Sequence, residues 1–329
     1  MLENFLPNEF VERLHKLFPD PNLIIKIIES FQIKKPITVR FNSLANLDRE
    51  ICQQELENLG LCLTPISWYP DAWLITTNLN INIAKTLESS IAWEKGALYR
   101  QNLSSMIPPL VLNPSPGDQV LDIAAAPGSK TTQLAALMKN TGLILANDTS
   151  YERLFKLKAN LKRLQVLNTT VQQSMGQTIW KNFSHIFDKV LADVPCSMEG
   201  RILNTKPETY EHWSVKQLKT LAERQVWLLR SAISATRPGG IVVYSTCTLS
   251  PEENECVINT AIKKSKKETI SIEPIELFSK QKNDITFPTL VPGITRWQDQ
   301  ELRPDLINTL RIAPSLWYEG FYVAKLKVN

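Results

Sequence analysis

Residues 120–131 read VLDIAAAPGSKT and decide the fold class. A hydrophobic run enters a turn of small residues, and a helical pattern follows the turn. Small residues let the backbone approach a ligand closely, and a helix N-terminus supplies free N–H groups. The stretch matches neither the GxxxxGK[ST] nor the GxGxxG pattern of phosphate-binding loops. It therefore predicts a strand–turn–helix unit that binds a ligand without a pyrophosphate group.

Around this unit, short apolar runs alternate with amphipathic helical patterns. Buried strands separated by helices are typical of a doubly wound, mostly parallel sheet. We therefore expect a Rossmann-like α/β domain over residues 96–329, with Pro238, Gly239 and Gly240 forming a sharp turn before its last parallel strand. The expected strands are residues 119–124, 143–147, 189–192 and 241–245, and the expected helices include residues 151–164 and 215–236.

Residues 1–95 show a different pattern, which predicts a smaller α+β module. Two short helices are expected before residue 35. A strand over residues 38–42, a helix over residues 48–59 and a strand-like segment over residues 61–77 should follow. We expect this module to contact the substrate and the α/β domain to carry the chemistry.

The composition excludes a disordered, fibrous or disulfide-stapled protein. The 329 residues are 43% hydrophobic and 21% charged, with a net charge of +4, which permits a nucleic-acid partner without requiring one. The sequence contains no membrane-length apolar run, and its N-terminus predicts an amphipathic helix instead of a signal peptide. The five cysteines form no C-x-x-C pair, so we expect no metal site and a reducing, cytoplasmic location.

Asp148 ends the strand that follows the small-residue turn. A carboxylate at the carboxyl edge of such a sheet can accept both hydroxyl groups of a ribose. Together with the absence of a phosphate loop, this favours a nucleoside cofactor without pyrophosphate, of which S-adenosylmethionine is the leading case. The alternative is a plain strand–helix turn in which Asp148 caps the next helix.

Cys196 and Cys247 each follow an expected strand, so both thiols should lie at this same edge. A lone cysteine is usually a small buried hydrophobe, but two at one functional edge favour chemistry. A thiolate that adds to carbon 6 of a pyrimidine makes carbon 5 nucleophilic enough to take a methyl group. Asp193 could deliver a proton to N3 if its pKa were raised, and the second thiol could assist elimination. The residues alone do not say which cysteine attacks.

The chain resembles the RNA cytosine-C5 methyltransferases related to the bacterial sun protein and the nucleolar NOL/NOP proteins. The ordered set of motifs carries this resemblance, since no single one is specific enough. The motifs are PITVRFNSL (36–44), YRQNLSSM (99–106), AAAPGSKT (124–131), DVPCSMEG (193–200) and YSTCTLSPEENE (244–255).

The resemblance implies an S-adenosylmethionine-dependent enzyme that makes 5-methylcytosine in structured RNA, either tRNA or rRNA, and not in DNA. It implies that Cys247 is the nucleophile, that Cys196 assists product release and that Asp193 contacts N3 and the amino edge of the base. It also implies a ribose contact from Asp148 and an ordering role for Arg153. The remaining cofactor contacts that it implies are Ala124, Ala125, Ala126, Pro127, Gly128, Ser129, Lys130, Ser174 and Asp193.

Several assignments stay open at this point. Arg40 and Asn42 are either RNA contacts or the exposed face of a strand, and the basic face of the helix over residues 151–164 is expected to be solvated. Ser250 to Glu253 predict a capping box, which leaves both glutamates outside the catalytic set. The family often has glycine where Ser129 and Met198 stand, and an acid near Ser174. A non-catalytic RNA-binding assembly factor with the same fold, and a DNA or small-molecule methyltransferase, are the competing hypotheses.

Overall fold

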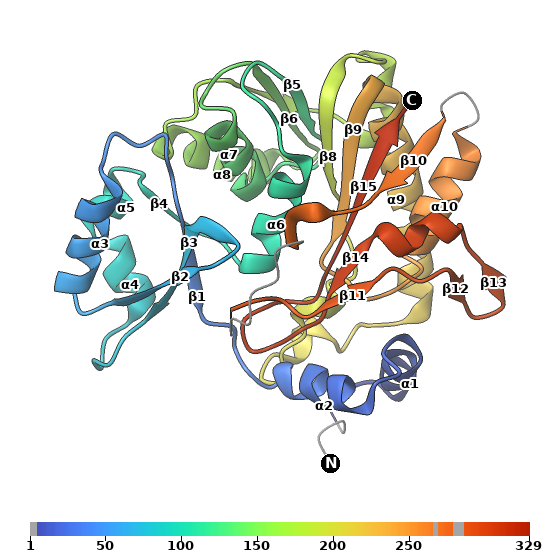
Figure 1. Ribbon diagram of the computed structural model, residues 1–329, viewed down its shortest axis with the longest axis horizontal. Coiled ribbons are helices and arrows are strands. Elements are labelled where there is room, and N and C mark those ends of the chain that lie inside the picture. Colours follow the sequence, from blue (N-terminus) through green and yellow to red (C-terminus); the bar gives the residue numbers. More distant parts are fainter. Residues whose placement is uncertain (1–4, 266–268, 279–285) are drawn as a thin grey trace.

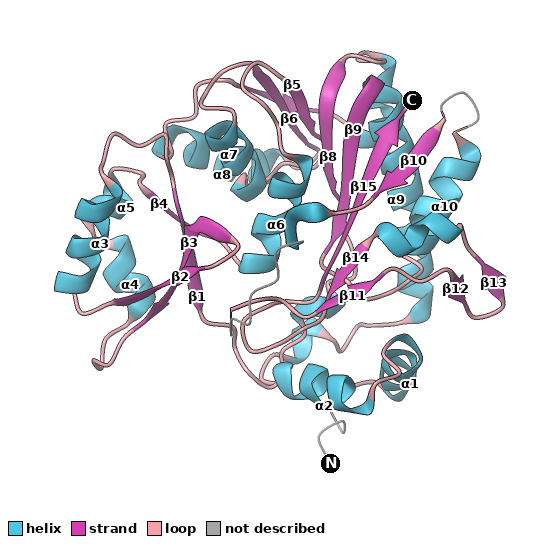
Figure 2. Ribbon diagram, viewed as in Figure 1, coloured by secondary structure: helices cyan, strands magenta, loops and turns pink. Residues whose placement is uncertain are grey.

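The fold combines a large and a small β-sheet, each flanked by helices (Figures 1 and 2). A computed structural model of the protein describes residues 5–265, 269–278 and 286–329. The large sheet has nine strands and the small sheet has four. Figure 1 shows the small sheet and its helices to one side of the large sheet.

Five parallel strands form the centre of the large sheet. Their order across the sheet is β7 (Thr169–Gln173), β6 (Leu143–Asp148), β5 (Gln119–Asp122), β8 (Phe187–Asp193) and β9 (Thr236–Thr246). From β5 the chain runs outward through β6 to β7, then returns to the other side of β5 as β8. Ligands of open α/β sheets bind at the carboxyl end of such a switch point. The Rossmann-like, mostly parallel sheet is confirmed.

Antiparallel strands extend the sheet beyond β9. They are β15 (Phe321–Val328), which pairs with β9, then β14 (Leu310–Ile312) and β11 (Leu290–Pro292), while β10 (Ile270–Glu273) also pairs with β15. A small hairpin of β12 (Arg296–Trp297) and β13 (Gln300–Glu301) stands apart. This extension covers the edge of β9, and its last strand brings residues near position 320 to the carboxyl end of the parallel strands.

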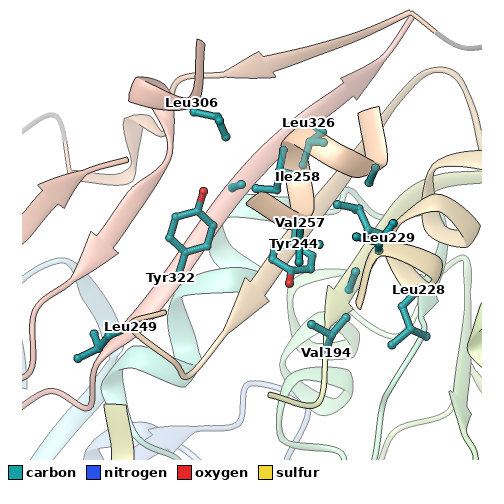
Figure 3. Close-up of a cluster of buried hydrophobic side chains, with 14 of the residues drawn as sticks. Val194, Leu228, Leu229, Tyr244, Leu249, Val257, Ile258, Leu306, Tyr322 and Leu326 are labelled. Carbon is teal, nitrogen blue, oxygen red and sulfur yellow. The ribbon is translucent and has the colours of Figure 1, made fainter. Parts of the chain in front are cut away.

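Helices pack on both faces of the large sheet. Val243 of β9 belongs to the cluster with α6 (Leu103–Leu112) and α7 (Ser129–Leu137), whereas Tyr244 belongs to the cluster with α9 (Val215–Ala235) and α10 (Glu255–Lys264). Figure 3 shows Tyr244 among Leu229, Val257 and Tyr322. This alternation is what two-sided burial of a strand requires. None of the helices within the described ranges is long and apolar enough to cross a membrane.

The small sheet has its own core. Its strands are β1 (Ile37–Phe41), β2 (Cys62–Ile66), β3 (Tyr69–Thr76) and β4 (Leu98–Arg100), and its helices are α3 (Arg49–Asn58), α4 (Ile83–Glu88) and α5 (Ile91–Glu94). Val39, Leu56, Trp73 and Leu98 are buried together there. The strand-like segment over residues 61–77 is a hairpin of β2 and β3, and the predicted helix is α3, which Asp48 caps.

The first two helices, α1 (Asn8–Leu17) and α2 (Pro21–Ser30), pack against the α/β domain and not against the small sheet. Phe10 and Phe31 belong to the same hydrophobic cluster as Ile202 and Leu249, and the Phe10 ring meets the edge of Trp213 at 5.4 Å. Figure 1 shows both helices below the large sheet. The division of the chain near residue 95 stays a prediction, but α1 and α2 contribute their apolar faces to the larger core.

The positions of Arg40 and Asn42 show that both interpretations made from the sequence, contact with RNA and the exposed face of a strand, are wrong. Arg40 is fully buried, and its guanidinium donates to Gln101 Oε1 and Thr132 Oγ1, each at 3.0 Å. The Asn42 amide donates to the backbone carbonyls of Gly96 and Leu164 at 2.9 Å. Both side chains cross the junction between the small sheet and the α/β domain. They are therefore neither exposed nor available to RNA, because buried polar groups take protein partners.

The structure also bears on two smaller predictions, the turn at residues 238–240 and the exposed lysine run at residues 263–267. Pro238, Gly239 and Gly240 lie within the bounds of β9, but the pairing with β8 skips from Thr236 to Ile241, and Gly239 has φ +80°. The turn predicted before Ile241 is therefore a bulge inside β9, and regular pairing continues from Ile241. A bulge satisfies the same glycine preference because one residue must adopt a left-handed conformation. Lys263 and Lys264 are exposed at the end of α10 as expected, while Lys266 and Lys267 lie outside the described residues.

Replacing Arg311 by methionine should destabilise the α/β domain by about 3–5 kcal/mol. The Arg311 guanidinium donates to both carboxylate oxygens of Glu255, at 2.8 and 2.9 Å, and both side chains are fully buried. The substitution leaves the Glu255 carboxylate buried without its cation. Urea unfolding measures the loss. The matched control is Arg296→Met, which breaks an exposed pair with Glu301 and should cost less than about 1 kcal/mol; equal losses would contradict the argument.

Candidate active site

Cys196 and Cys247 lie side by side where β8 and β9 end. The two strands are parallel neighbours, with Asp193 opposite Ser245, so the turns that follow them start at the same level. The two Sγ atoms are 3.4 Å apart. Both cysteines are half-buried free thiols. The structure therefore brings together the two thiols that the sequence analysis assigned to one edge.

Cys196 is held in its thiol form. Its hydrogen bond with Cys247 raises the pKa of Cys196 well above the ordinary value, and burial raises this pKa further. A thiol can donate a proton but is a poor nucleophile, because the thiolate is the attacking species. In this arrangement Cys196 suits proton transfer to or from its neighbour better than it suits attack.

Asp193 is held between a cation and a hydroxyl group. Lys130 Nζ lies 2.7 Å from Asp193 Oδ2, and Ser245 Oγ donates to Asp193 Oδ1 at 2.8 Å. Lys130 also donates to Ser105 Oγ at 2.8 Å, and only 9% of its side chain is exposed. The site therefore orients Asp193 as an acceptor of hydrogen bonds.

The small-residue loop joins β5 to α7 and forms one wall of a cavity. Gly128 has φ +103°, a left-handed conformation that favours glycine, and a Cβ atom there would also lie 2.7 Å from Leu157 Cδ1, the movable end of that side chain. Gly128 has no side chain to cap α7, which leaves the first N–H groups of the helix available to an anionic group. A carboxylate of a small-molecule ligand fits this position.

The cavity at the carboxyl end of the parallel strands has a volume of about 320 Å³. Nine of the predicted site residues line it: Ala124, Ala125, Ala126, Pro127, Ser129, Lys130, Arg153, Asp193 and Cys247. The other four predicted site residues do not line it: Gly128, Asp148, Ser174 and Cys196. A larger, open hollow of about 810 Å³ between α9, α10 and the β12–β13 hairpin lies away from the thiols. We place the site in the smaller cavity because the reactive groups converge there.

Asp148 stabilises the small-residue loop by hydrogen bonds. Its carboxylate accepts hydrogen bonds from the backbone N–H of Ala126 at 3.1 Å and of Ser150 at 3.0 Å, and Arg153 lies 3.3 Å from it. Arg153 also donates to the carbonyl of Ala126. The helix α8 (Tyr151–Arg163) is capped by Ser150, so the alternative in which Asp148 caps it is wrong. Asp148 and Arg153 therefore fix the position of the loop.

Ser174 ties the ends of two strands together. Its hydroxyl donates to Asn147 Oδ1 at 2.8 Å, and the Asn147 amide donates to the Ser174 carbonyl at 3.1 Å. This pair closes the gap between the ends of β6 and β7. The adenine contact assigned to Ser174 by resemblance stays a prediction.

The basic residues of α8 fall into two groups, one exposed to solvent and one in contact with the small sheet. Lys156, Lys158 and Lys162 are exposed, as expected of a solvated face. Arg163 is instead half-buried, with its guanidinium 4.2 Å from the centre of the Trp93 ring, and it donates to the carbonyls of Trp93 and Leu98. Arg163 therefore joins α8 to the small sheet.

Asp122, which the site prediction omitted, is the buried acid of the cavity floor. Burial raises the pKa of Asp122 to about 7, although its hydrogen bond from Thr131 opposes the shift. Perturbed carboxyl groups of this kind cluster at functional sites. The sequence contained a signal that could have identified Asp122 as a site residue, since Asp122 ends the strand that leads into the small-residue loop.

Arg201 and Glu319 also line the cavity without having been predicted. Arg201 Nε lies 3.3 Å from Glu319 Oε2, and burial raises the pKa of Glu319. The Gly200 N–H donates to the Cys247 carbonyl at 3.0 Å, and a Cβ atom on Gly200 would lie 2.1 Å from the Gly320 carbonyl oxygen. This backbone contact brings residues 201 and 319 together, and no local pattern encodes it.

The predicted capping box is wrong, and its second glutamate lies beside the thiols. The helix α10 begins at Glu255 after Asn254, four residues later than the box implies. Glu253 points inward and accepts hydrogen bonds from the Ser197 N–H at 3.0 Å and from the Gln225 amide at 2.8 Å. These donors come from the turn after β8 and from α9, so tertiary contacts outcompete the local cap.

Met198 stands in a left-handed conformation, with φ +59° and ψ +27°. Glycine adopts this conformation without steric cost, whereas other residues lose roughly 1–2 kcal/mol. This explains why glycine suits that position in the resembling family. The turn after β8 adopts this conformation with methionine, and Cys196 and Cys247 are in contact.

The comparisons with known proteins agree with this geometry. A family model described as 16S rRNA methyltransferase RsmB/F matches residues 109–327. The chain is 35% identical to the tRNA (cytosine(49)-C(5))-methyltransferase of Pyrococcus abyssi, over 89% of each chain. It is 35% identical to a 28S rRNA (cytosine-C(5))-methyltransferase of Mus musculus, covering 96% of this chain but only 38% of that protein.

A solved structure shares the whole architecture. The methyltransferase homologue from Pyrococcus horikoshii superimposes with a TM-score of 0.80 at 31% identity, covering 97% of this chain and 94% of that one. The family model spans most of the α/β domain, and the relative from Pyrococcus abyssi extends the match into the small sheet. The chain therefore belongs to the RsmB/F family of methyltransferases.

Proposed function

We propose that the protein transfers a methyl group from S-adenosylmethionine to carbon 5 of cytosine in structured RNA. The observation that carries this proposal is the pair of thiols 3.4 Å apart, one of which lines a cavity that also contains Asp193 and the small-residue loop. Relatives named for tRNA and for rRNA cytosines support the same reaction on RNA.

The residues of the cavity fit S-adenosylmethionine. The uncapped N-terminus of α7 suits the carboxylate of its methionine part, and the carboxyl groups of Asp122 and Asp193 suit its ammonium group. The small side chains of Ala124, Ala125 and Ala126 leave room for the ligand beside the backbone. A volume of about 320 Å³ lies at the lower end of the range of small-molecule sites. When bound, the cofactor supplies an electrophilic methyl group.

In the proposed mechanism the Cys247 thiolate adds to carbon 6 of the cytosine. The electron pair of the carbon 5–carbon 6 double bond then becomes available at carbon 5, which would take the methyl group as the bond from that group to the sulfonium sulfur breaks and leaves a neutral thioether. A base such as water then removes the proton from carbon 5, and the electrons of that carbon–hydrogen bond restore the double bond as the sulfur–carbon bond breaks and Cys247 leaves as a thiolate. Cys196, at 3.4 Å from Cys247, is placed to exchange a proton with the departing thiolate.

Asp193 orients the base in this mechanism. Lys130 and Ser245 hold its carboxylate in place, and the carboxylate accepts a hydrogen bond from the amino group of cytosine. Uracil has a carbonyl oxygen at that position and would leave Asp193 facing an acceptor. This contact therefore selects cytosine over uracil, in line with the cost of unpaired buried polar groups.

We further propose that residues 1–95 guide the RNA to the site. The support is that β1 of this module pairs with β4, which lies just beyond residue 95 and contributes Arg100 to the cavity wall. The Arg100 side chain is 45% exposed and forms an ion pair with Glu88 of the module at 3.1 Å. The target base must be unstacked to reach the thiols, so a cation at the rim can hold the flanking phosphate.

Transfer of labelled methyl from S-adenosylmethionine tests the function. Transcripts of tRNA and fragments of rRNA should accept the label, and bisulfite sequencing should place it on cytosine. DNA of the same sequence should accept none. Binding of the cofactor without transfer to any RNA would support a non-catalytic assembly factor instead.

S-adenosylmethionine should raise the melting temperature of the protein, and Asp148→Ala should remove most of that rise. A ligand at 100 times its Kd stabilises the folded state by about 2.7 kcal/mol. Asp148 holds the Ala126 N–H of the loop and carries the proposed ribose contact, so its loss weakens cofactor binding. The matched control is Asp188→Ala, which removes an acid paired with Arg237 near the opposite end of β8. An unchanged shift in Asp148→Ala would contradict the assignment.

A further inference from the structure

The residues that follow the two cysteines touch each other as the cysteines do. Ser197 follows Cys196 and Thr248 follows Cys247, and their hydroxyl oxygens are 2.7 Å apart. The turns after β8 and β9 are therefore joined twice, by a sulfur contact at the cavity and by a hydroxyl contact behind it. The second contact plays no part in the mechanism proposed above.

A buried glutamate stands at each end of this hydroxyl pair. Ser197 Oγ is hydrogen-bonded to Glu253 Oε1, and Thr248 Oγ1 lies 2.9 Å from Glu199 Oε2. The exposed fractions are 0% for Glu253 and 2% for Glu199. Carboxyl groups are rarely buried to this extent without a cation as a direct partner. Four groups thus form one chain, in the order Glu253, Ser197, Thr248, Glu199.

The chain of four groups requires one more proton than its hydroxyls possess. Its three oxygen–oxygen contacts each need a hydrogen atom, and a serine and a threonine hydroxyl supply one each. The third hydrogen must come from a carboxyl group. One of the two glutamates is therefore neutral, and the other carries the charge.

The backbone and side-chain donors show which glutamate is neutral. Glu199 accepts an N–H on each oxygen, from Trp213 Nε1 at 2.7 Å and from the Leu249 backbone at 3.1 Å, so neither oxygen is free to be an O–H group. In Glu253 both N–H donors, from Ser197 and Gln225, meet Oε2. Among the described residues, Glu253 Oε1 contacts only the Ser197 hydroxyl, and it is the oxygen that can hold the proton.

We propose that Glu253 is a positioning residue that holds one proton, which it shares with ionised Glu199 through Ser197 and Thr248. This proton completes the hydrogen bonds that join the turn after β8, which carries Cys196, to the turn after β9, which carries Cys247. Because Glu253 is then neutral, no negative charge of Glu253 faces the Cys196 thiol. The consequence for the thiols rests on the proposed function, whereas the shared proton rests on the hydrogen bonds alone.

The surroundings of the two carboxyl groups support this assignment. Burial raises the pKa of Glu253 to about 7, and the charge of Glu199 raises it as well. Burial also raises the pKa of Glu199, but the hydrogen bonds from Trp213 and Thr248 and the charge of Arg13 in α1 oppose that shift. The other titratable groups that face Glu253 are Cys196 and Tyr244, whose pKa values are both raised. Above pH 7 Glu253 loses the proton that supplies the third hydrogen of the four hydrogen-bonded groups. The contact between the Ser197 and Thr248 hydroxyl oxygens then becomes repulsive.

Two isosteric variants separate this proposal from its alternatives. In Glu253→Gln the amide can donate to Ser197 Oγ and accept both N–H groups, which reproduces the neutral acid. In Glu199→Gln an amide N–H must face either the Trp213 indole or the Leu249 N–H. Glu253→Gln should keep its melting temperature at pH 6, while Glu199→Gln should lose roughly 5 °C or more. The reverse order would overturn the choice of Glu253, and a gain in both variants would overturn the shared proton.

Infrared spectroscopy detects the proton directly. The carbonyl stretch of a buried carboxylic acid should be present at pH 6 and lost above pH 8, and it should lose the Glu253 component in Glu253→Gln. The matched control is Asp122→Asn, because the pKa of Asp122 is also about 7 and contributes a second band. An unchanged spectrum in Glu253→Gln would overturn the proposal. If the wild type transfers no methyl group, the proposed function fails, and this spectrum still decides the inference.

Discussion

Replacing Cys247 by alanine is expected to abolish methyl transfer to RNA, by more than about 1,000-fold. Without the thiol, carbon 5 of cytosine is not activated, since no other cysteine lines the cavity within the described residues. The fold should persist, because Cys247 is half-buried and its neighbours are held by the backbone and by the Thr248 hydroxyl. Labelled methyl incorporation, with saturating RNA and cofactor, measures the effect.

Cys256→Ala is the matched control for this experiment. Cys256 lies on α10, and burial raises its pKa to about 12, so it is an inert thiol outside the cavity. This variant should retain wild-type transfer. Retained transfer in Cys247→Ala would refute the nucleophile assignment and the covalent mechanism with it. Thermal unfolding of both variants distinguishes lost chemistry from lost structure.

Replacing Cys196 by alanine is expected to trap the protein on its RNA. The adduct at Cys247 can still form, but the thiol 3.4 Å away that exchanges a proton at release is missing. We expect a covalent protein–RNA complex that survives denaturing electrophoresis, with turnover reduced by about 100-fold or more. The wild type should show no such band at steady state.

The double variant Cys196→Ala/Cys247→Ala supplies the control, and it should form no adduct. If Cys247→Ala formed the adduct and Cys196→Ala did not, the roles of the two cysteines would be exchanged. The contact between them is symmetric in distance. The position of Cys247 on the cavity wall, which Cys196 does not line, favours the assignment made here.

Local sequence patterns predicted the large sheet well. The four runs predicted as strands, residues 119–124, 143–147, 189–192 and 241–245, correspond to the parallel strands β5, β6, β8 and β9, and the small-residue loop leads into α7 as predicted. The strand β7 and the antiparallel strands of the large sheet were not identified from the sequence. Strands buried on both faces are hydrophobic throughout, and helices between them repeat with a period near 3.6, so both leave a signal within a few residues. Because parallel strands end at one edge, the proximity of Cys196 and Cys247 was predicted as well.

The errors fall on polar residues whose partners are distant in sequence. Arg40 was assigned to RNA or to solvent, but its guanidinium reaches Thr132 across the junction of the two sheets. Glu253 was assigned to a helix cap, but Ser197 and Gln225 offer it stronger partners. A local pattern cannot compete with donors from another element, since a buried polar group takes whatever partner the fold places beside it.

The sequence alone determined the class of fold, the motifs of the family and the two cysteines, because these depend on strand periodicity and on residues within one turn. Only the tertiary structure decided that Lys130 holds Asp193, that Arg201 meets Glu319 and that two buried glutamates stand behind the thiols. Those contacts join residues tens of positions apart. They exist because the parallel strands bring separate turns to one edge, where burial obliges every charged group to find a partner or a proton.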